Sequence, residues 1–211
     1  MFKLYGFTPT RSARAKWALQ EVGAKFEYIE AASLIGSDEL RQLHPQAKVP
    51  AFLHDDKVLF ESVAIVNYIC DLHPDADLIS KTGTYERALH DQWSCYALAE
   101  LETWTWTIAK HSNLLPEERR VAAVIPSAME ELTKSVAIVE QALHGSDYLV
   151  GNKFSAADIN IGYVLNQARA KGLVSTSSNI EGYLNRIGDR PASTISEQRA
   201  FEEKVRQQTD V

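Results

Sequence analysis

The chain has 211 residues, of which 45% are hydrophobic and 24% are charged, and its formal net charge is -6. These values are typical of a globular protein with one large core or two smaller ones, and they argue against a disordered chain. Apart from Arg119-Arg120 there is no cluster of basic residues. A surface for nucleic acid or for an anionic membrane is therefore not expected.

Two cysteines in a chain of this length indicate a reducing compartment rather than a disulfide framework, and we interpret Cys70 and Cys95 as small buried hydrophobic residues. No signal-peptide pattern follows Met1, and no apolar run approaches the roughly 18 residues of a membrane span. The six histidines lack the spacing of a metal site. We expect a cytoplasmic protein that binds no metal and no membrane.

The first quarter of the chain shows short β-prone runs that alternate with a helical one. Residues 2–7 (FKLYGF) predict a largely buried strand, which the loop at residues 8–12 ends. The next run carries apolar residues at helical spacing up to Gly23, a residue typical of a helix C-terminus. Residues 26–29 predict a second strand.

A short helix and a hairpin follow. Residues 34–43 predict the helix, with Ser37 as its candidate N-cap. Residues 49–60 (VPAFLHDDKVLF) predict an antiparallel hairpin with its turn at Asp55-Asp56, and Ser62 is the predicted N-cap of a helix over residues 63–72. The predicted order is thus β-α-β-α-β-β-α, ending near residue 75.

Beyond residue 82 the pattern changes to long helical runs with almost no strand signal. A broad apolar stripe predicts a helix from about Tyr85 to Lys110. Pro126 is expected to kink or split the helical region that contains it, because proline lacks the N–H of a helical bond.

The last part of the chain carries a helix-start signal. Ser155 and Asp158 have the spacing of a capping box, in which each side chain satisfies a backbone N–H of the other residue. The run that follows is apolar almost all round, which predicts a buried helix. Two more helices are predicted at residues 180–187 and 195–207, the final one largely solvated.

The stretch from Val49 to Ser62 can complement a small peptide. Pro50 favours a bend that leaves the N–H and C=O of Val49 free to pair with an extended backbone. The helix start at Ser62 favours a carboxylate, and Glu61 beside it can accept from an ammonium.

These residues resemble a known family. VPAFL followed by LFES, with KLYGF earlier and the segment from Gly151 to Asp158 later, is similar to the cytosolic glutathione S-transferases, and to bacterial members of the serine/threonine type. The resemblance implies an α/β plus all-α fold with a thioredoxin-like glutathione-binding domain at residues 1–75. A linker at 76–82 and an all-helical domain at 83–211 would follow.

The resemblance also implies glutathione as co-substrate, a small hydrophobic electrophile as second substrate, and a homodimer. Val49 and Pro50 would hold the cysteinyl part of glutathione, Glu61 and Ser62 its γ-glutamyl end, and Gln46 or Lys48 its glycyl carboxylate. Lys48 as a solvated loop lysine is nearly as good an interpretation. Candidates for the electrophile pocket are Tyr96, Trp104, Trp106 and His111, although aromatic residues at helical spacing most often belong to a core.

The chemistry is expected where the first strand meets the first helix, because a helix N-terminus and a hydroxyl donor favour a thiolate. Relatives of the tyrosine type carry their phenol where this chain has Phe7, and relatives of the cysteine type carry a cysteine that this loop lacks. Thr8, Thr10 and Ser12 remain as hydroxyl donors. Thr10 matches the family's hydroxyl position, although Pro9 can shift the register by one. That Thr10 or Ser12 only caps the helix is an equally good interpretation.

The leading function that the resemblance implies is conjugation of the glutathione thiolate to small hydrophobic electrophiles, a detoxification reaction. One alternative is glutathione-dependent reduction of disulfides or peroxides without an enzyme cysteine. Another is a non-catalytic interaction module of the same fold.

Overall fold

The computed structural model describes residues 1–173 and 177–209. The chain divides into two compact units, one made of Met1–Ser80 with Gly188–Val211 and one of Lys81–Ile187. The predicted domain limits at residues 75 and 82 stay a prediction, and the compact units differ from them in grouping the last segment with the first. None of the helices in the described ranges is long and apolar enough to cross a membrane.

The first unit is built on a mixed four-stranded sheet in the order β2-β1-β3-β4. Strand β1 (Phe2–Gly6) lies parallel to β2 (Phe26–Glu30) and antiparallel to β3 (Ala51–His54), and β3 forms the predicted hairpin with β4 (Lys57–Phe60). The predicted thioredoxin-like order of elements is confirmed.

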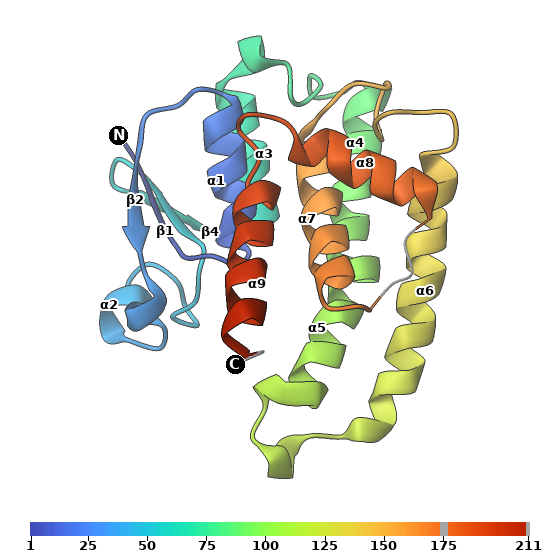
Figure 1. Cartoon of the computed structure of the whole chain (residues 1–211). Coiled ribbons are helices and arrows are strands. Elements are labelled where there is room, and N and C mark those ends of the chain that lie inside the picture. The colour runs from blue at the N-terminus through green and yellow to red at the C-terminus, as the bar shows by residue number, and fades with distance from the viewer. Residues whose placement is uncertain (174–176, 210–211) are drawn as a thin grey trace. The chain divides into compact units, whose positions relative to one another are not determined.

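Two helices of the first unit pack against each other, α1 (Ser12–Glu21) and α3 (Ser62–Leu72) (Figure 1). Trp17, Ile65 and Ile69 on these helices are fully buried. The short helix α2 (Asp38–Arg41) begins at the predicted N-cap, where the Leu40 N–H donates to Ser37 Oγ over 3.1 Å. Single helical turns lie at Ala32–Leu34 and Pro74–Ala76.

The last helix, α9 (Ile195–Thr209), belongs to the first unit, and hydrogen bonds join it to α1. Lys16 Nζ donates to both carboxylate oxygens of Glu197, over 2.7 and 2.9 Å. Just before α9, Arg190 donates two hydrogen bonds to Glu21, over 2.7 and 2.8 Å. Ile195 is fully buried and Gln198 is 1% exposed, so the first turn of this helix is partly buried, whereas the sequence predicted a largely solvated helix. The charged residue of this turn, Glu197, is bonded to Lys16 of α1.

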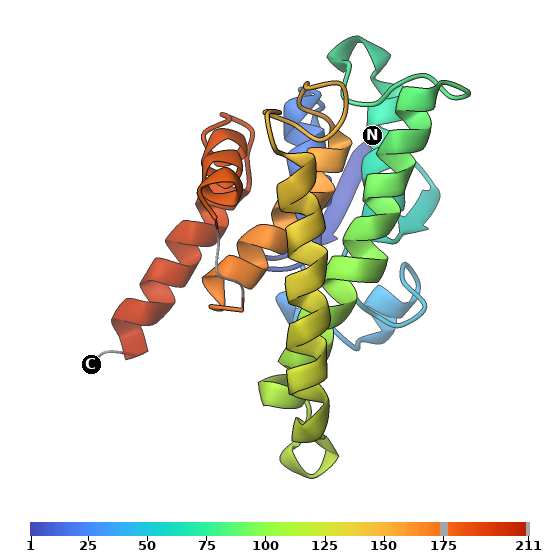
Figure 2. The same ribbon diagram turned by 90° about the vertical axis from the view of Figure 1, so that its right-hand side faces the viewer.

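The second unit is helical. Helix α4 (Tyr85–Tyr96) continues through a π-helical segment (Ala97–Glu102) into α5 (Thr103–Ala109) and a last π-helical segment (Lys110–Leu114), which confirms the predicted long helix. Figure 2 shows α6 (Ile125–Ala142) running alongside this helix.

Pro126 does not kink α6, and that prediction was wrong. Pro126 lies in the first turn of the helix, where the backbone N–H would have no helical partner and its loss costs little. Cys95 also differs from its prediction, because its side chain is exposed on α4 whereas Cys70 is buried.

Helix α7 (Ala156–Ala170) is buried almost all round, and the predicted capping box at its start is present. The Asp158 carboxylate accepts hydrogen bonds from the N–H of Ser155 over 2.8 Å and of Leu149 over 3.1 Å. It also accepts one over 3.1 Å from the hydroxyl of Tyr183 on α8 (Ser178–Gly188). One fully buried carboxylate thus joins the start of α7, the preceding loop and α8.

Burial raises the pKa of Asp158 to about 6, against the hydrogen bonds that lower it. The folded chain therefore binds this proton more readily than the unfolded chain does, and the stability gained from protonation is complete below pH 3.8 and lost as the pH rises to about 6. Relative to Asp158→Asn, the free energy of unfolding of the wild type should fall by about 3 kcal/mol across this window. Urea unfolding at several pH values measures it, and equal pH slopes for both proteins would contradict it.

Candidate active site

Three segments leave the sheet at one end. Tyr5 pairs with Ala51, and Ala51 pairs with Phe60. Because β1 ends at Gly6, β3 begins at Ala51 and β4 ends at Phe60, the segments at residues 7–12, 49–50 and 61–62 follow or precede the sheet at the same end. The register of the sheet therefore brings the predicted catalytic loop, the bend at Pro50 and the start of α3 together.

The first segment turns tightly between β1 and α1. A Cβ atom on Gly6 would lie 2.4 Å from Ser12 Cβ and 2.5 Å from Ser12 Oγ, so only glycine allows Ser12 to approach the strand end. The approach places Ser12 Oγ 3.2 Å from the Phe7 N–H that donates to it. The Thr8-Pro9 peptide bond in this turn is cis.

Two hydroxyls are joined in this turn. Thr10 Oγ1 donates to the Phe7 carbonyl over 2.6 Å and lies 2.7 Å from Ser12 Oγ. Ser12 is fully buried, whereas Thr10 is half-buried. Burial raises the pKa of the nearby Tyr28 phenol, and a hydrogen bond with Ser12 opposes that rise. Of these two hydroxyls, only that of Thr10 can be reached by a ligand.

Thr8 differs from both. It is half-buried, and its hydroxyl forms no hydrogen bond within residues 1–173 and 177–209. The three predicted donors thus lie in one turn. Ser12 is fully buried, Thr10 is bonded to the backbone, and the hydroxyl of Thr8 has no hydrogen bond among the described residues.

The second segment presents an open backbone. The Val49-Pro50 peptide bond is cis, and in the described part of the chain neither the N–H nor the C=O of Val49 forms a hydrogen bond. Both groups remain available to an extended peptide, as predicted. The loop before the bend is held by the Ala47 N–H, which donates to the His44 carbonyl over 2.7 Å.

Gln46 and Lys48 lie exposed on the same loop, and Lys48 Nζ donates to Gln46 Oε1 over 2.9 Å. Each side chain therefore already holds the other. Lys48 can still bind a ligand carboxylate, because an ammonium has three donors and the bond to Gln46 uses one of them.

The third segment begins α3. Glu61 is the N-cap residue and has φ 71° and ψ 108°, so the prediction that Ser62 caps the helix was wrong by one position. A residue other than glycine is uncommon at this φ. Residues with such strained backbone angles cluster at functional sites. Glu61 is exposed, whereas Ser62 is buried and its Oγ accepts a hydrogen bond from Arg14 Nη1 over 3.2 Å.

Comparisons with known proteins agree with this geometry. The profile "Glutathione S-transferase, N-terminal domain" matches residues 1–71, and "Glutathione S-transferase, C-terminal domain" matches residues 92–191. The chain belongs to the glutathione S-transferase family of enzymes.

Individual relatives of this glutathione S-transferase match over most of its length. "Glutathione S-transferase GstA" of Escherichia coli O157:H7 is 28% identical over 82% of this chain and 86% of the relative. "Probable glutathione S-transferase GSTF1" of Oryza sativa subsp. japonica is 30% identical over 72% of this chain and 73% of the relative. A crystal structure of a glutathione transferase from Methylococcus capsulatus superposes with a TM-score of 0.79 at 28% identity, covering 96% of this chain and 99% of the other.

The predicted electrophile-pocket residues of the transferase all lie in the second unit. The side chains of two of them form hydrogen bonds with the backbone of this unit. The Tyr96 hydroxyl donates to the Ser135 carbonyl over 3.1 Å, and His111 Nδ1 accepts from the Val121 N–H over 3.1 Å. Trp106 is 39% exposed. The indole N–H of Trp104 is buried and has no hydrogen-bond partner within the described residues. Their role toward a substrate stays a prediction.

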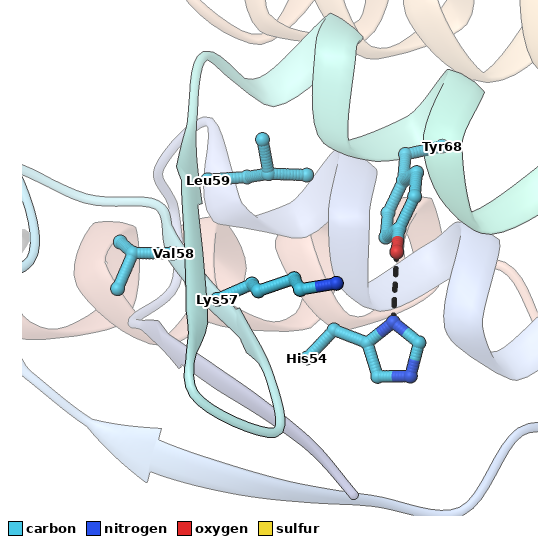
Figure 3. A pocket seen from close by; sticks show the side chains of 5 residues that line it. All are labelled: His54, Lys57, Val58, Leu59 and Tyr68. Atoms are coloured by element: carbon cyan, nitrogen blue, oxygen red, sulfur yellow. Dashed lines mark hydrogen bonds between the residues drawn. The ribbon is translucent and has the colours of Figure 1, made fainter.

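A cavity of about 200 Å³ lies in the first unit. His54, Lys57, Val58, Leu59 and Tyr68 line it, and Figure 3 shows the Tyr68 hydroxyl directed at His54 Nδ1, 2.8 Å away. None of the predicted site residues lines this cavity. Among the described residues, no group of three or more His, Cys, Asp or Glu could hold a metal ion.

Arg14 is the site residue to which sequence reasoning assigned no role. It belongs to the stretch resembling the family pattern around Thr10, but nothing in the sequence indicates that its guanidinium is fully buried and reaches Ser62. The signal is the combination of a charged residue with an apolar helix face, because an arginine on such a face needs a polar partner.

Gly6→Ala tests the close approach that builds the turn. Its Cβ would overlap Ser12, so the turn must open, and the free energy of unfolding should fall by about 1–3 kcal/mol. Gly182→Ala is the matched control, since a Cβ there meets nothing within 4 Å, and it should be neutral or slightly stabilising. Urea unfolding of both variants measures this, and equal losses would contradict the steric argument.

Proposed function

We propose that this glutathione S-transferase conjugates the glutathione thiolate to small hydrophobic electrophiles, with Thr10 as the donor to the sulfur. The observation that carries the proposal is the hydroxyl pair at the start of α1, in a turn that contains no cysteine. The open backbone of Val49 and the helix start at Ser62 lie at the same end of the sheet and would hold the rest of the tripeptide.

The hydrogen atoms of the turn decide what Thr10 can donate. The Phe7 N–H donates to Ser12 Oγ over 3.2 Å, and the one hydrogen of Ser12 has two acceptors within reach, the Phe7 carbonyl at 3.2 Å and Thr10 Oγ1 at 2.7 Å. The single hydrogen of Thr10 points to the Phe7 carbonyl without a ligand. When a thiolate lies nearby, a rotation about the C–O bond redirects that hydrogen to the sulfur, since a charged acceptor is stronger than a carbonyl.

The reaction then needs no enzyme cysteine, because the nucleophile is the sulfur of glutathione. Glutathione loses its thiol proton to solvent, and the thiolate attacks an electrophilic carbon. A carbon–sulfur bond forms, and in a halogenated substrate the carbon–halogen bond breaks and the halide leaves with its electron pair. A free thiol has a pKa of about 8.5, so stabilising the thiolate by about 2.7 kcal/mol makes it the main form at neutral pH.

The second candidate is reduction of a disulfide or peroxide by two glutathione molecules. The absence of a cysteine from the turn favours it over thiol exchange through the enzyme, because glutathione would supply both sulfur atoms. Cytoplasmic location, a homodimer and a role in detoxification are part of the same proposal and rest on the family.

Thr10→Val removes the hydroxyl and keeps the shape. The pKa of the bound glutathione thiol should rise by about one to two units, because one hydrogen bond to a charged group is worth about 1.5–3 kcal/mol. The KM for glutathione should change little. The thiolate absorbance of the binary complex, titrated with pH, measures the pKa. Thr8→Val is the control, and a shift in Thr8→Val with none in Thr10→Val would reassign the donor to Thr8.

A pair of substrates separates conjugation from reduction. Turnover should be fast with a chlorinated nitroaromatic compound, with one chloride released per conjugate, and at least about tenfold slower with a mixed disulfide of glutathione. Cys95→Ser is the control because Cys95 is the exposed cysteine. Faster turnover of the disulfide that survives Cys95→Ser would instead support the reductase.

A further inference from the structure

We propose that His44 is a positioning residue for glutathione, whose imidazole fixes the turn that presents the Val49 backbone and does so only in its neutral form. The inference rests on the proposed function, in which Val49 pairs with the cysteinyl part of glutathione. It assigns a role to a buried side chain that acts through the loop and not by contact with the ligand. It also makes the affinity for glutathione depend on a proton of the enzyme.

Residues 44–47 form a tight turn in the loop before β3. The Ala47 N–H donates to the His44 carbonyl over 2.7 Å, so His44 holds the first of the four positions. Pro45 holds the second, where proline favours a turn. At the first position Asn, Asp or Ser is usual, because the side chain can accept from the backbone N–H two residues on. His44 Nδ1 takes this part, and the Gln46 N–H donates to it over 3.1 Å.

The turn ends in a strained residue. Ala47 has φ 48°, in the left-handed region where a residue with a Cβ is uncommon. Such a residue keeps its conformation only where its surroundings hold it. The Ala47 carbonyl accepts from the Gly36 N–H over 3.0 Å, and the fully buried side chain belongs to a core cluster with Leu40 and Ala51. The His44 imidazole adds a further restraint, because it bonds the N–H of the residue before Ala47.

The same core cluster extends to the backbone that would bind the peptide. Val49 is partly buried and packs against the cluster of Leu40, Ala47 and Ala51. It lies two residues after Ala47, and in the described part of the chain its own N–H and C=O form no hydrogen bond. Because no backbone bond of its own fixes Val49, its position depends on where the turn places Ala47. Loosening the turn should therefore displace the groups that would pair with glutathione.

The bond to Gln46 fixes the protonation state of His44. Nδ1 accepts from an N–H, so it carries no hydrogen, and the proton of the neutral ring is on Nε2. An imidazolium carries a hydrogen on both nitrogens. Protonation therefore changes Nδ1 from an acceptor into a donor that faces the Gln46 N–H. The turn loses this bond, and two donors are directed at each other.

The surroundings of His44 oppose its protonation. The residue is 8% exposed, and its ring lies against the Phe60 ring of β4 with the centroids 5.1 Å apart. Burial lowers the pKa of His44 from its ordinary value of 6.5. The Glu61 carboxylate at the start of α3 and the carbonyl of His44 itself raise this pKa, and the Lys48 ammonium of the same loop lowers it. The net pKa lies below 6.5, so the neutral form holds the turn at neutral pH.

The first test measures binding of S-methylglutathione to the full-length enzyme by calorimetry, because this analogue has no thiol proton. At neutral pH, His44→Leu removes the acceptor and should weaken binding about 3- to 10-fold. His44→Asn keeps an acceptor at the same place, since Asn Oδ1 and His Nδ1 are both attached to Cγ. Its affinity should stay within about twofold of the wild type.

The pH profile is the second test, and a merely structural histidine would not change it. The affinity of the wild type relative to His44→Asn should be constant above pH 6.5 and fall about 3- to 10-fold toward about pH 5. Protonation removes the same bond that His44→Leu removes, whereas asparagine does not titrate. By reciprocity, binding in this range should release a proton from the wild type and none from His44→Asn. Heats measured in two buffers of different ionisation enthalpy give that proton count.

His54→Leu is the matched control. His54 is a histidine of the same unit, but it lies at the end of β3 far from Val49 and its Nδ1 is bonded to the Tyr68 hydroxyl. Its loss should lower the melting temperature and leave both the affinity and the pH profile as in the wild type.

Each outcome decides one question. A wild type that binds neither glutathione nor S-methylglutathione would overturn the proposed function itself. A wild type that binds while His44→Leu binds equally well at neutral pH would overturn only the role of His44, and a pH effect would then reflect charge alone. A wild type whose affinity relative to His44→Asn does not change with pH would also overturn it. Should His44→Leu fail to fold, this comparison with His44→Asn decides by itself.

Discussion

The missing side chain of Gly6 is the constraint on which the site depends. It lets Ser12 lie against the end of β1 at a distance that any Cβ would prevent, and this contact fixes where α1 begins. From that point the Phe7 N–H can reach Ser12 Oγ, and Ser12 in turn meets Thr10. A single close approach therefore sets both the direction of the helix and the orientation of the hydroxyl offered to a ligand.

Two helices begin near the same end of the sheet, and the N-termini of both favour a negative charge. Helices α1 and α3 both begin where the paired residues Tyr5, Ala51 and Phe60 end the ladder. Both N-termini favour an anion, so one ligand with a thiolate and a carboxylate can be matched at two places. In the strand order of the sheet, β3 lies between β1 and β4. Val49, just before β3, therefore lies between the two helix starts, and its free backbone groups can pair with an extended peptide. Under the proposed function, recognition of a tripeptide would thus depend on the spacing of these three segments.

Local signals predicted much of this fold because they depend on near neighbours. The capping box of Ser155 and Asp158, the N-cap Ser37 and the β3–β4 hairpin involve residues within a few positions of each other. The failures concern context. Pro126 is harmless because the helix happens to begin beside it. The link between α9 and α1 joins Lys16 to Glu197 across 181 positions, and no periodicity carries that information. Arg14 was missed for the same reason, since its partner lies on another helix.

The resting arrangement of Thr10 has a consequence for the chemistry. Its hydrogen already forms a bond of 2.6 Å to the Phe7 carbonyl, so a ligand must compete with a good acceptor for it. A neutral thiol is a weak acceptor and does not win this competition, whereas a thiolate does. Under the proposed function, the turn would therefore discriminate between the two protonation states of the sulfur, and Thr10 would donate only to the anion. The proposed Thr10 donor would thus favour the thiolate by the difference between its bond to the anion and its present bond to the Phe7 carbonyl.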